Sequence, residues 1–520
     1  MSTVLKTKVT LNVPLNRVEG DLEIRVEVDG DRVIDAWSSG TMYRGIENIL
    51  HGRQATDGLV ITPRVCGICG TAHLYAAVKA LEAVNGVRPL PDAVRLRNLT
   101  LLAEHLQSDV RQAFLMFTAD FVNPAYKDLQ GYAEAVRRYT PLAGETVLEV
   151  IRETRKIVEI VAILGGQWPH SAFMVPGGVV TVPSQDDLLA CENLLQRYRR
   201  WYEQRVLGCS VERFLEVQSA AALDAFLEEN SSQRESDLGF FAAFARRIGL
   251  DRIGGGYGRF ITFGQLDLPA EPGESGEAAI ESGGGGFHYP AGFADGLDVQ
   301  PLLQAKITED VSHSWFEDDA EARHPFEGRT EPYATGGESR KYSWAKAPRY
   351  NGLPAETGPL AEMVVFGNRL ITDLIRRDGV SAYLREFARV IRPAYLIPVM
   401  EQWLEETNPC EKFYLPPEPI ESGRGFGMVG ASRGALGHWI TVDGGRIERY
   451  QIITPTAWNG SPRDREGVRG PWEEALIGTT VKDVENPVEL GHVVRSFDPC
   501  LVCTVHALHG PSRKVTRTRV

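Results

Sequence analysis

Two Cys-x-x-Cys pairs at opposite ends of the 520-residue chain constrain its fold more than any other sequence feature. The first lies in "RVCGICGTAH", residues 64–73, and the second in "DPCLVCTVH", residues 498–506. Four soft thiolates in one place suit zinc, an iron–sulfur cluster or nickel. Zinc sites usually close short local loops, so a separation of over 400 residues disfavours zinc and predicts a site built from both chain ends.

The spacing alone leaves a structural Cys₄ zinc site and an iron–sulfur cluster as open alternatives. A thioredoxin-like redox pair is disfavoured because no βαβ pattern surrounds either cysteine pair. The chain has 7 cysteines, an odd and sparse set that does not resemble a secreted disulfide framework. A reducing compartment with metal-binding or catalytic thiols is therefore expected.

Charge and hydropathy exclude two classes of function. The formal net charge of −13 argues against a nucleic-acid surface, which needs a basic stripe. No run of 18 apolar residues is present, so no membrane-spanning helix is expected. The start, "MSTVLKTKVTLNVPL", has neither an apolar export core nor twin arginines, so we expect a cytoplasmic protein that reaches the cytoplasmic side of a membrane only through partners.

Hydrophobic periodicity predicts a mainly helical α+β fold. A β-hairpin is expected around Asp29-Gly30, and a second in "HWITVDGGRIERYQII", residues 438–453. The first cysteine pair is expected at the N-terminus of a helix. Helical spacing recurs at roughly 92–118, 145–164, 184–229, 232–248 and 359–406. The glycine-rich stretch 254–296 is expected to be an irregular surface excursion. The prediction is a long-helix bundle core with small β elements from both chain ends.

The residues around both pairs, and a series of stretches between them, resemble the large subunit of nickel–iron hydrogenases. The family pattern Arg-x-Cys-Gly-x-Cys-x-x-x-His is met at 64–73, and Asp-Pro-Cys-x-x-Cys-x-x-His at 498–506. Further similar stretches, in order, are "NRVEG" (16–20), "YRGIE" (43–47), "GGQWPH" (165–170), "SHSW" (312–315), "YSWAKAPRYNGLPAETGPLA" (342–361), "SRGALGHW" (432–439) and "YQIITPTAWNGSPRD" (450–464). The resemblance thus covers the whole chain and is specific.

The resemblance implies one nickel and one iron held by four thiolates. Cys66 and Cys500 would bind nickel alone, while Cys69 and Cys503 would bridge both metals. The iron would also carry carbon monoxide and cyanide ligands. The implied reaction is H2 ⇌ 2 H⁺ + 2 e⁻.

Further residues carry implied roles around that centre. Cys500 would accept the first proton and Glu19 would be the next proton relay; Asp21 follows Gly20 where the family commonly has histidine. Arg433 would lie over the metals and donate to a cyanide, although Ser432 replaces the usual proline before it.

Four side chains would support this arrangement. Asp109 and Asp498 would orient the arginine, Thr456 would bond the second cyanide, and His73 would donate to a bridging sulfur. Without the resemblance, Asp498 before a proline would be an ordinary turn former, and His73 a satisfied core histidine.

The resemblance implies a second, magnesium-type ion bound by Glu47, His506 and the backbone carbonyl of Ile452. A histidine nitrogen is an unusual ligand for a hard cation, so this assignment rests on the resemblance. Residues 507–520, "ALHGPSRKVTRTRV", would be a maturation peptide that an endopeptidase removes after nickel insertion.

The organisation implied is one intertwined catalytic unit over 1–506. It comprises an N-terminal region (1–90), a helical core (91–253), the glycine-rich excursion (254–296), a helical and β region (297–497) and the C-terminal pair (498–506). The tail and texture are most like the actinobacterial group 2 uptake enzymes (Huc type).

The remaining cysteines at 191, 209 and 410 are too scattered to hold an electron relay, so an iron–sulfur small subunit is required, with a quinone as final acceptor through partners. Nickel-insertion proteins are the other implied partners. Rival functions are an H2 sensor signalling to a kinase, the quinone-site subunit of respiratory complex I, and a zinc-stapled binding protein. The intact four cysteines argue against the complex I relative.

Overall fold

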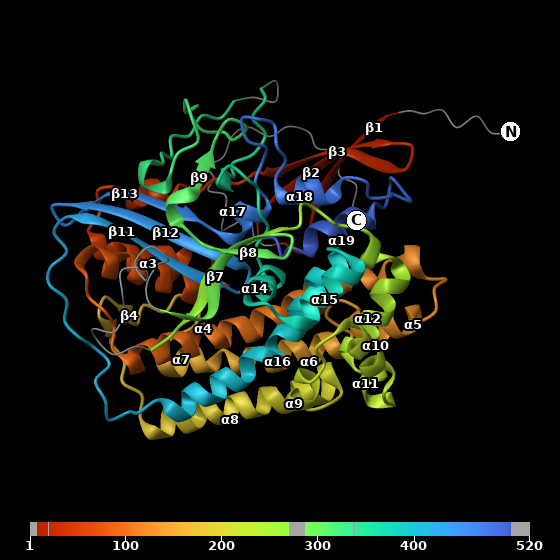
Figure 1. Ribbon diagram of the computed structural model, residues 1–520, viewed down its shortest axis with the longest axis horizontal. Helices are drawn as coiled ribbons and strands as arrows, with labels where there is room; N and C mark the ends of the chain where they lie inside the picture. Colours follow the sequence, from red (N-terminus) through yellow and green to blue (C-terminus); the bar gives the residue numbers. More distant parts are fainter. Residues whose placement is uncertain (1–7, 19, 270–285, 336–338, 501–520) are drawn as a thin grey trace.

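The computed structural model describes residues 8–18, 20–269, 286–335 and 339–500. Long helices fill the lower half of the molecule in Figure 1, and small sheets lie above them. The fold is therefore mainly helical with small β elements, as the sequence predicts.

The helices are α1 (Ile46–Leu50), α2 (Gly58–Ile61), α3 (Gly70–Asn85), α4 (Pro91–Arg111), α5 (Tyr132–Tyr139), α6 (Glu145–Ile157), α7 (Glu159–Gly165), α8 (Gln185–Trp201), α9 (Val211–Leu215), α10 (Ala220–Glu228), α11 (Ser231–Glu235), α12 (Asp237–Ile248), α14 (Pro359–Phe366), α15 (Arg369–Asp378), α16 (Ala382–Glu406), α17 (Pro455–Asn459), α18 (Pro471–Leu476) and α19 (Val488–Arg495).

The strands form five small antiparallel sheets in the described part of the chain. Their members are β1 (Val9–Leu15), β2 (Leu22–Asp29) and β3 (Arg32–Gly40); β4 (Met174–Val175) and β5 (Gly178–Val179); β6 (Arg259–Asp267), β7 (Phe287–Asp295) and β8 (Asp298–Pro301); β9 (Ile307–Asp310) and β10 (Ala347–Tyr350); and β11 (Gly423–Ala431), β12 (Gly434–Asp443) and β13 (Arg446–Ile453). Both expected hairpins are present. The turn of the second has positive φ at Gly444 and Gly445, which type I′ turns require.

Two sequence expectations about local structure are wrong. The helix expected over 184–229 ends as α8 and a π-helical turn to Leu207, because Gly208 takes a left-handed conformation; α9 and α10 follow as separate short helices. The glycine-rich stretch 254–296 contains regular structure. Residues 259–267 and 287–295 pair as β6 and β7, and most of β6 is buried. The high glycine content of this stretch therefore led to a wrong prediction for β6, whose buried side chains, such as Phe263, pack in the core.

Helix α3 lies directly against β11, and glycine makes this contact possible. A Cβ atom at Gly427 would lie 2.0 Å from the carbonyl oxygen of Ala76, and one at Gly425 would lie 2.2 Å from that of Ala80. Only residues without a side chain allow such an approach. Glu104 of α4 accepts the backbone N–H of Thr71 and so binds the first turn of α3. The N-terminus of α3 is thereby fixed from two sides.

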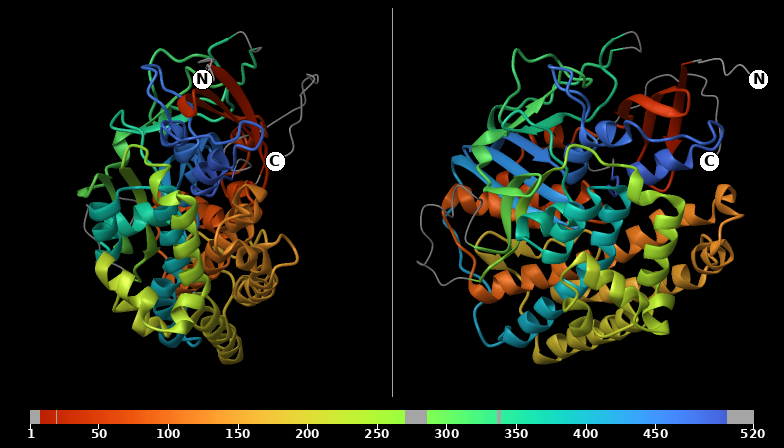
Figure 2. Two further views of the ribbon diagram at one scale, coloured as in Figure 1. Left: turned by 90° about the vertical axis from the view of Figure 1, so that its right-hand side faces the viewer. Right: turned by 45° about the vertical axis from the view of Figure 1, so that its right-hand side comes forward.

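The two ends of the chain share one hydrophobic cluster. Ile24 and Val26 of the N-terminal sheet pack with Trp472 of α18 and Val493 of α19. Backbone hydrogen bonds also join Val33 to the 478–479 segment. Figure 2 shows the N-terminal strands (red) beside the C-terminal helices (blue). This packing brings the segments that carry both cysteine pairs into one region.

None of the helices in the described residues is long and apolar enough to cross a membrane.

Candidate metal centre

Three of the four predicted thiolate ligands lie in the described chain, and they are buried. The Sγ atoms of Cys66 and Cys500, 434 residues apart in sequence, lie 3.5 Å from each other. This separation is well beyond a disulfide bond, so the two cysteines are not joined by one. Cys69 is the N-cap of α3 and is 5 % exposed. The structure thus brings together the predicted ligands from the two ends.

Short local contacts fix the Cys500 segment. The backbone N–H of Cys500 donates to Thr456 Oγ1 at 3.0 Å, from the first turn of α17. Asp498 has a φ of 56°, a left-handed conformation that aspartate tolerates better than most residues. The chain therefore turns sharply just before the cysteine. The Thr456 hydroxyl hydrogen is still available to donate, and its predicted bond to a cyanide stays a prediction.

Arg433 is buried and has one hydrogen-bond donor without a partner among the described residues. Its Nε donates to Asp498 Oδ1 at 3.0 Å, and its buried Nη1 has no hydrogen-bond partner among the described residues. Burial opposes the charge, but Asp498 and then the thiolates of Cys500 and Cys66 outweigh it, so the pKa of Arg433 is raised well above its usual value. An unpaired guanidinium N–H beside thiolates is the donor that an anionic ligand on a metal there would need.

Asp109 reaches this arginine only indirectly. It binds Arg392 through both carboxylate oxygens, at 2.8 and 2.7 Å, and lies 3.4 Å from Arg389 Nη1. Arg389 Nη1 also lies 3.1 Å from Asp498 Oδ2. Among the described residues Asp109 is linked to Arg433 indirectly: Arg389 joins Asp109 to Asp498, and Asp498 binds Arg433. The orienting role of Asp109 stays a prediction.

The sequence analysis missed Arg389 and Arg392. Both project from the buried helix α16, where Glu386 also lies, and burial raises the pKa of Glu386 to about 8 despite the opposing charge of Arg389. The available signal was the spacing: Glu386, Arg389 and Arg392 recur every three residues in a segment that is otherwise apolar on that face. Charged residues on such a face are buried only with partners.

His73 is buried in the first turn of α3, and its Nδ1 lies 3.1 Å from Nε2 of His438. Burial lowers the pKa of His73 to about 4, although the Cys66 thiolate acts in the opposite direction. The imidazole is therefore neutral. The predicted bond from His73 to a bridging sulfur stays a prediction. His438 lies in the stretch "SRGALGHW" but has no role in the sequence predictions.

The second predicted ion site is partly described. Glu47 Oε1 accepts the backbone N–H of Ile452 at 2.9 Å. The N–H and C=O of one strand residue point to the same side, so the carbonyl of Ile452 also faces Glu47. Lys346 Nζ lies 3.3 Å from Glu47 Oε2 and already compensates its charge. A carboxylate and a carbonyl are donors that a hard cation prefers.

Three predicted site residues, Glu19, Cys503 and His506, lie outside the described residues. Within the described ranges, no three His, Cys, Asp or Glu side chains are positioned to hold one metal ion by themselves. The donor chemistry of the described residues nevertheless fits the implied groups: soft buried thiolates for nickel and iron, and hard oxygens for the second ion.

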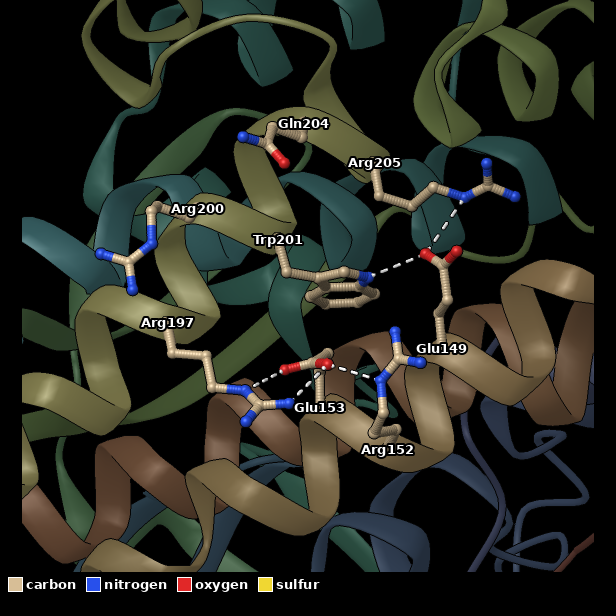
Figure 3. A pocket seen from close by; sticks show the side chains of 8 residues that line it. All are labelled: Glu149, Arg152, Glu153, Arg197, Arg200, Trp201, Gln204 and Arg205. Atoms are coloured by element: carbon tan, nitrogen blue, oxygen red, sulfur yellow. Dashed lines mark hydrogen bonds and ion pairs between the residues drawn. The ribbon is translucent and has the colours of Figure 1, made fainter.

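A surface cavity of about 440 Å³ lies elsewhere, between α6 and the end of α8 (Figure 3). Its arginines are largely paired: Glu153 binds Arg152 and Arg197, and Glu149 accepts from Trp201. None of the predicted site residues lines it.

Comparison with known proteins gives one family. Residues 44–135 and 130–506 match the family described as nickel-dependent hydrogenase. The chain is 33% identical over 537 residues to the periplasmic [NiFeSe] hydrogenase large subunit of Desulfomicrobium baculatum, covering 97% of this chain and 96% of that protein. It is 28% identical over 595 residues to the uptake hydrogenase large subunit of Rhodobacter capsulatus, covering 98% and 96%.

Solved structures agree with this result. The reduced Ni-Fe-Se hydrogenase of Desulfovibrio vulgaris Hildenborough superposes with a TM-score of 0.80 at 29% identity, over 96% of this chain and 100% of that one.

Proposed function

The chain belongs to the nickel-dependent hydrogenase family, and from this premise we propose that it is the catalytic large subunit of an uptake hydrogenase, oxidising H2 to protons and electrons. It has the fold of the large subunits, and a small subunit is its expected partner. The observation that supports the proposal best is the 3.5 Å approach of Cys66 and Cys500, whose charges act on the buried Arg433.

The described residues would have separate roles in the site. Cys66, Cys69 and Cys500, with Cys503, would hold a nickel–iron centre, which supplies the two-electron redox chemistry when bound. Arg433 would donate to an anionic iron ligand such as cyanide, and Thr456 would donate to a second. Glu47, the Ile452 carbonyl and His506 would hold Mg²⁺.

Proton transfer would begin at the Cys500 thiolate. A thiolate can take a proton at its sulfur. The hydrogen bond from the Cys500 N–H to Thr456 would keep the backbone of Cys500 in place during this transfer. Glu19 would be the next acceptor. Burial around Cys500, which is 0 % exposed, excludes bulk water from the first transfer.

Finer assignments extend the proposal. Electrons would pass to an iron–sulfur small subunit and then to a quinone. We place the chain in the actinobacterial group 2 (Huc-type) uptake class, on the cytoplasmic side, and its similarity to uptake hydrogenase large subunits supports the uptake part of this placement. Maturation would require nickel-insertion proteins and an endopeptidase cutting after His506.

The test is metal and mass analysis of the complex purified with its small subunit. We expect nickel and iron together, a C-terminus at His506 and H2-dependent dye reduction. Cys500→Ser should abolish nickel binding, whereas Cys410→Ser, at an exposed position, should leave it unchanged. Zinc alone in the wild-type protein would refute the proposal. Nickel and iron with an uncut C-terminus and very slow turnover would favour the H2 sensor instead.

A further inference from the structure

The cavity between α6 and the end of α8 carries more positive charge than its own carboxylates compensate (Figure 3). Its volume of about 440 Å³ lies in the range of small-molecule sites. Arg205 is compensated twice, because its Nε lies 3.5 Å from Glu149 Oε2 and 3.0 Å from Asp237 Oδ2. The three other arginines have one lining carboxylate among them, that of Glu153, so two positive charges are in excess. These three, here called the arginine triad, are Arg152, Arg197 and Arg200.

Glu153 holds two members of the triad in place. Its side chain is 6 % exposed, and it accepts from Arg197 Nε at 2.7 Å and from Arg152 Nε at 2.8 Å. Within the described part of the chain, Arg197 Nη1 and both terminal nitrogens of Arg152 have no acceptor. Glu159, whose charge also acts on Arg197, is already paired with Lys156 at 2.9 Å. A nearly buried carboxylate thus orients two guanidinium groups and leaves N–H donors for a further acceptor.

Arg200 adds a third guanidinium group to the cavity. It follows Arg197 by three residues on α8, so the two side chains are neighbours on one helix face. Arg200 has no hydrogen-bond or ion-pair partner in the described ranges, and Figure 3 draws none. Like charges at this spacing destabilise a helix. A bound anion would remove that repulsion.

The available donors fit phosphate oxygens. Guanidinium groups bind phosphate through paired, charge-assisted hydrogen bonds. The triad reaches the cavity from two helices, and a tetrahedral phosphate presents oxygens in several directions, whereas a carboxylate presents two in one plane. Trp201 is only 9 % exposed and donates to Glu149 Oε2 at 3.2 Å, so it offers no free face for an aromatic ring. Recognition at this cavity would therefore depend on charge.

We propose that the arginine triad is the binding site of a small phosphate-bearing ligand with at least two negative charges. The two excess positive charges match such a ligand, and the cavity has room for it. The chain as a whole carries a net charge of −13, so this local excess, and not the overall charge, would attract the anion. The site is separate from the proposed metal centre, because none of the predicted site residues lines the cavity.

Isothermal titration calorimetry of the purified two-subunit complex with sodium pyrophosphate tests the site. Wild type should bind pyrophosphate in low salt and bind it more weakly as the ionic strength rises. Arg200→Gln should weaken binding at least about tenfold, because a charge-assisted contact is lost. Since Arg200 is exposed and unpaired in the described structure, the variant should keep the wild-type melting temperature.

Arg376→Gln is the matched control. Arg376 is exposed on α15, lacks a partner in the same described ranges and lies outside the cavity lining, so the substitution removes the same charge elsewhere. Its affinity for pyrophosphate should equal that of wild type. Equal weakening in both variants would show that only the overall charge matters and would overturn the proposal.

Two further probes separate the chemistry from the source of the ligand. Succinate, a dianion with carboxylate chemistry, should bind at least about tenfold more weakly than pyrophosphate. Flotation with phosphatidic acid vesicles, compared with phosphatidylcholine vesicles, distinguishes a lipid headgroup from a soluble compound. Retention of wild type but not of Arg200→Gln on phosphatidic acid identifies the lipid, and pyrophosphate binding without retention identifies a soluble ligand.

The proposal is overturned if wild type binds neither pyrophosphate nor phosphatidic acid, or if succinate binds as tightly as pyrophosphate. None of these measurements depends on the nickel or iron content of the complex. Their outcome therefore leaves the proposed hydrogenase function to be tested separately.

Discussion

At the scale of single residues, the candidate site depends on polar atoms whose partners come from distant parts of the chain. Arg433 is held by Asp498 alone in the described structure, and Asp498 in turn by Arg389. The Cys500 backbone is held by Thr456. Each contact is buried, so losing one partner leaves the other without water to replace it.

Replacing Thr456 with valine tests this dependence. The change keeps the side-chain shape but leaves the Cys500 N–H without its acceptor, which should cost about 1–3 kcal/mol and reduce nickel occupancy. Thermal unfolding and metal analysis measure the two effects. Thr454→Val is the control: it removes the N-cap of the same helix, at about 1 kcal/mol, without touching Cys500. Equal nickel loss in both variants would contradict the assigned role.

At the scale of secondary-structure elements, the site depends on how closely α3 lies against β11 and how α18 is tied to β3. Glycines in β11 bring the helix that carries Cys69 within backbone contact of the strand. Buried Glu473 of α18 accepts from the Ser38 N–H at 2.9 Å and from the Tyr342 hydroxyl at 2.7 Å.

Gly427→Ala should displace α3. The new methyl group would lie 2.0 Å from a helix carbonyl oxygen, so backbone must move, at a cost of about 3 kcal/mol or more. The cysteine pair moves with the helix, and nickel content should fall together with the melting temperature. Gly255→Ala, where the nearest atom is 3.8 Å from the new carbon, should change neither. A fully loaded Gly427→Ala enzyme would show that the close approach is not required.

Glu473→Gln should change how stability depends on pH. Burial raises the pKa of Glu473 from 4.5 to about 7, although hydrogen bonds from Tyr342 and Ser38 act against it. Between these values the unfolded chain releases the proton and the folded one keeps it, so this group makes the fold less stable as pH rises, by roughly 3 kcal/mol in all.

Glutamine does not titrate, so the variant lacks this decrease in stability as pH rises. The variant should therefore gain stability relative to wild type between pH 4.5 and pH 7, measured as the difference in melting temperature at pH 5 and pH 8. Glu474→Gln, on the same helix but only half-buried, is the matched control. A constant difference for Glu473→Gln would contradict the expected titration.

At the scale of the whole molecule, the chain ends are joined by packing and by buried charge. The N-terminal sheet and helices α18 and α19 share one apolar cluster. Beside it, Arg495 donates to Asn16 Oδ1 at 2.8 Å and binds the buried carboxylate of Asp120. The two thiol-bearing segments are thus held in the same region by contacts outside the site itself.

Arg495→Met should weaken this junction. It removes one partner of a buried carboxylate, at roughly 3–5 kcal/mol, and frees the segment that leads to Cys500. The expected outcome is a lower melting temperature and incomplete nickel loading. Arg424→Met breaks an exposed pair with Glu327 and should cost less than about 1 kcal/mol. If both substitutions have the same effect, the junction does not stabilise the site.

How far the sequence could predict the structure varied with the range of the interaction. Short patterns predicted the hairpin turns and the helix after the first cysteine pair. The family resemblance predicted the candidate ligand residues. Gly208 breaks the helix expected over 184–229, and β6 lies inside a stretch read as irregular, because glycine signals alone do not show which neighbours are buried.

By itself, the sequence determined the candidate residues of the site: four cysteines, an arginine, the acids and their order along the chain. The tertiary structure alone decided which of them meet. Arg389 separates Asp109 from Arg433, and His438 with Tyr450 lies behind His73, because side chains on α3, α16 and two strands are brought together by packing between segments hundreds of residues apart. Local patterns carry no information on such contacts, since they depend on how whole elements are packed.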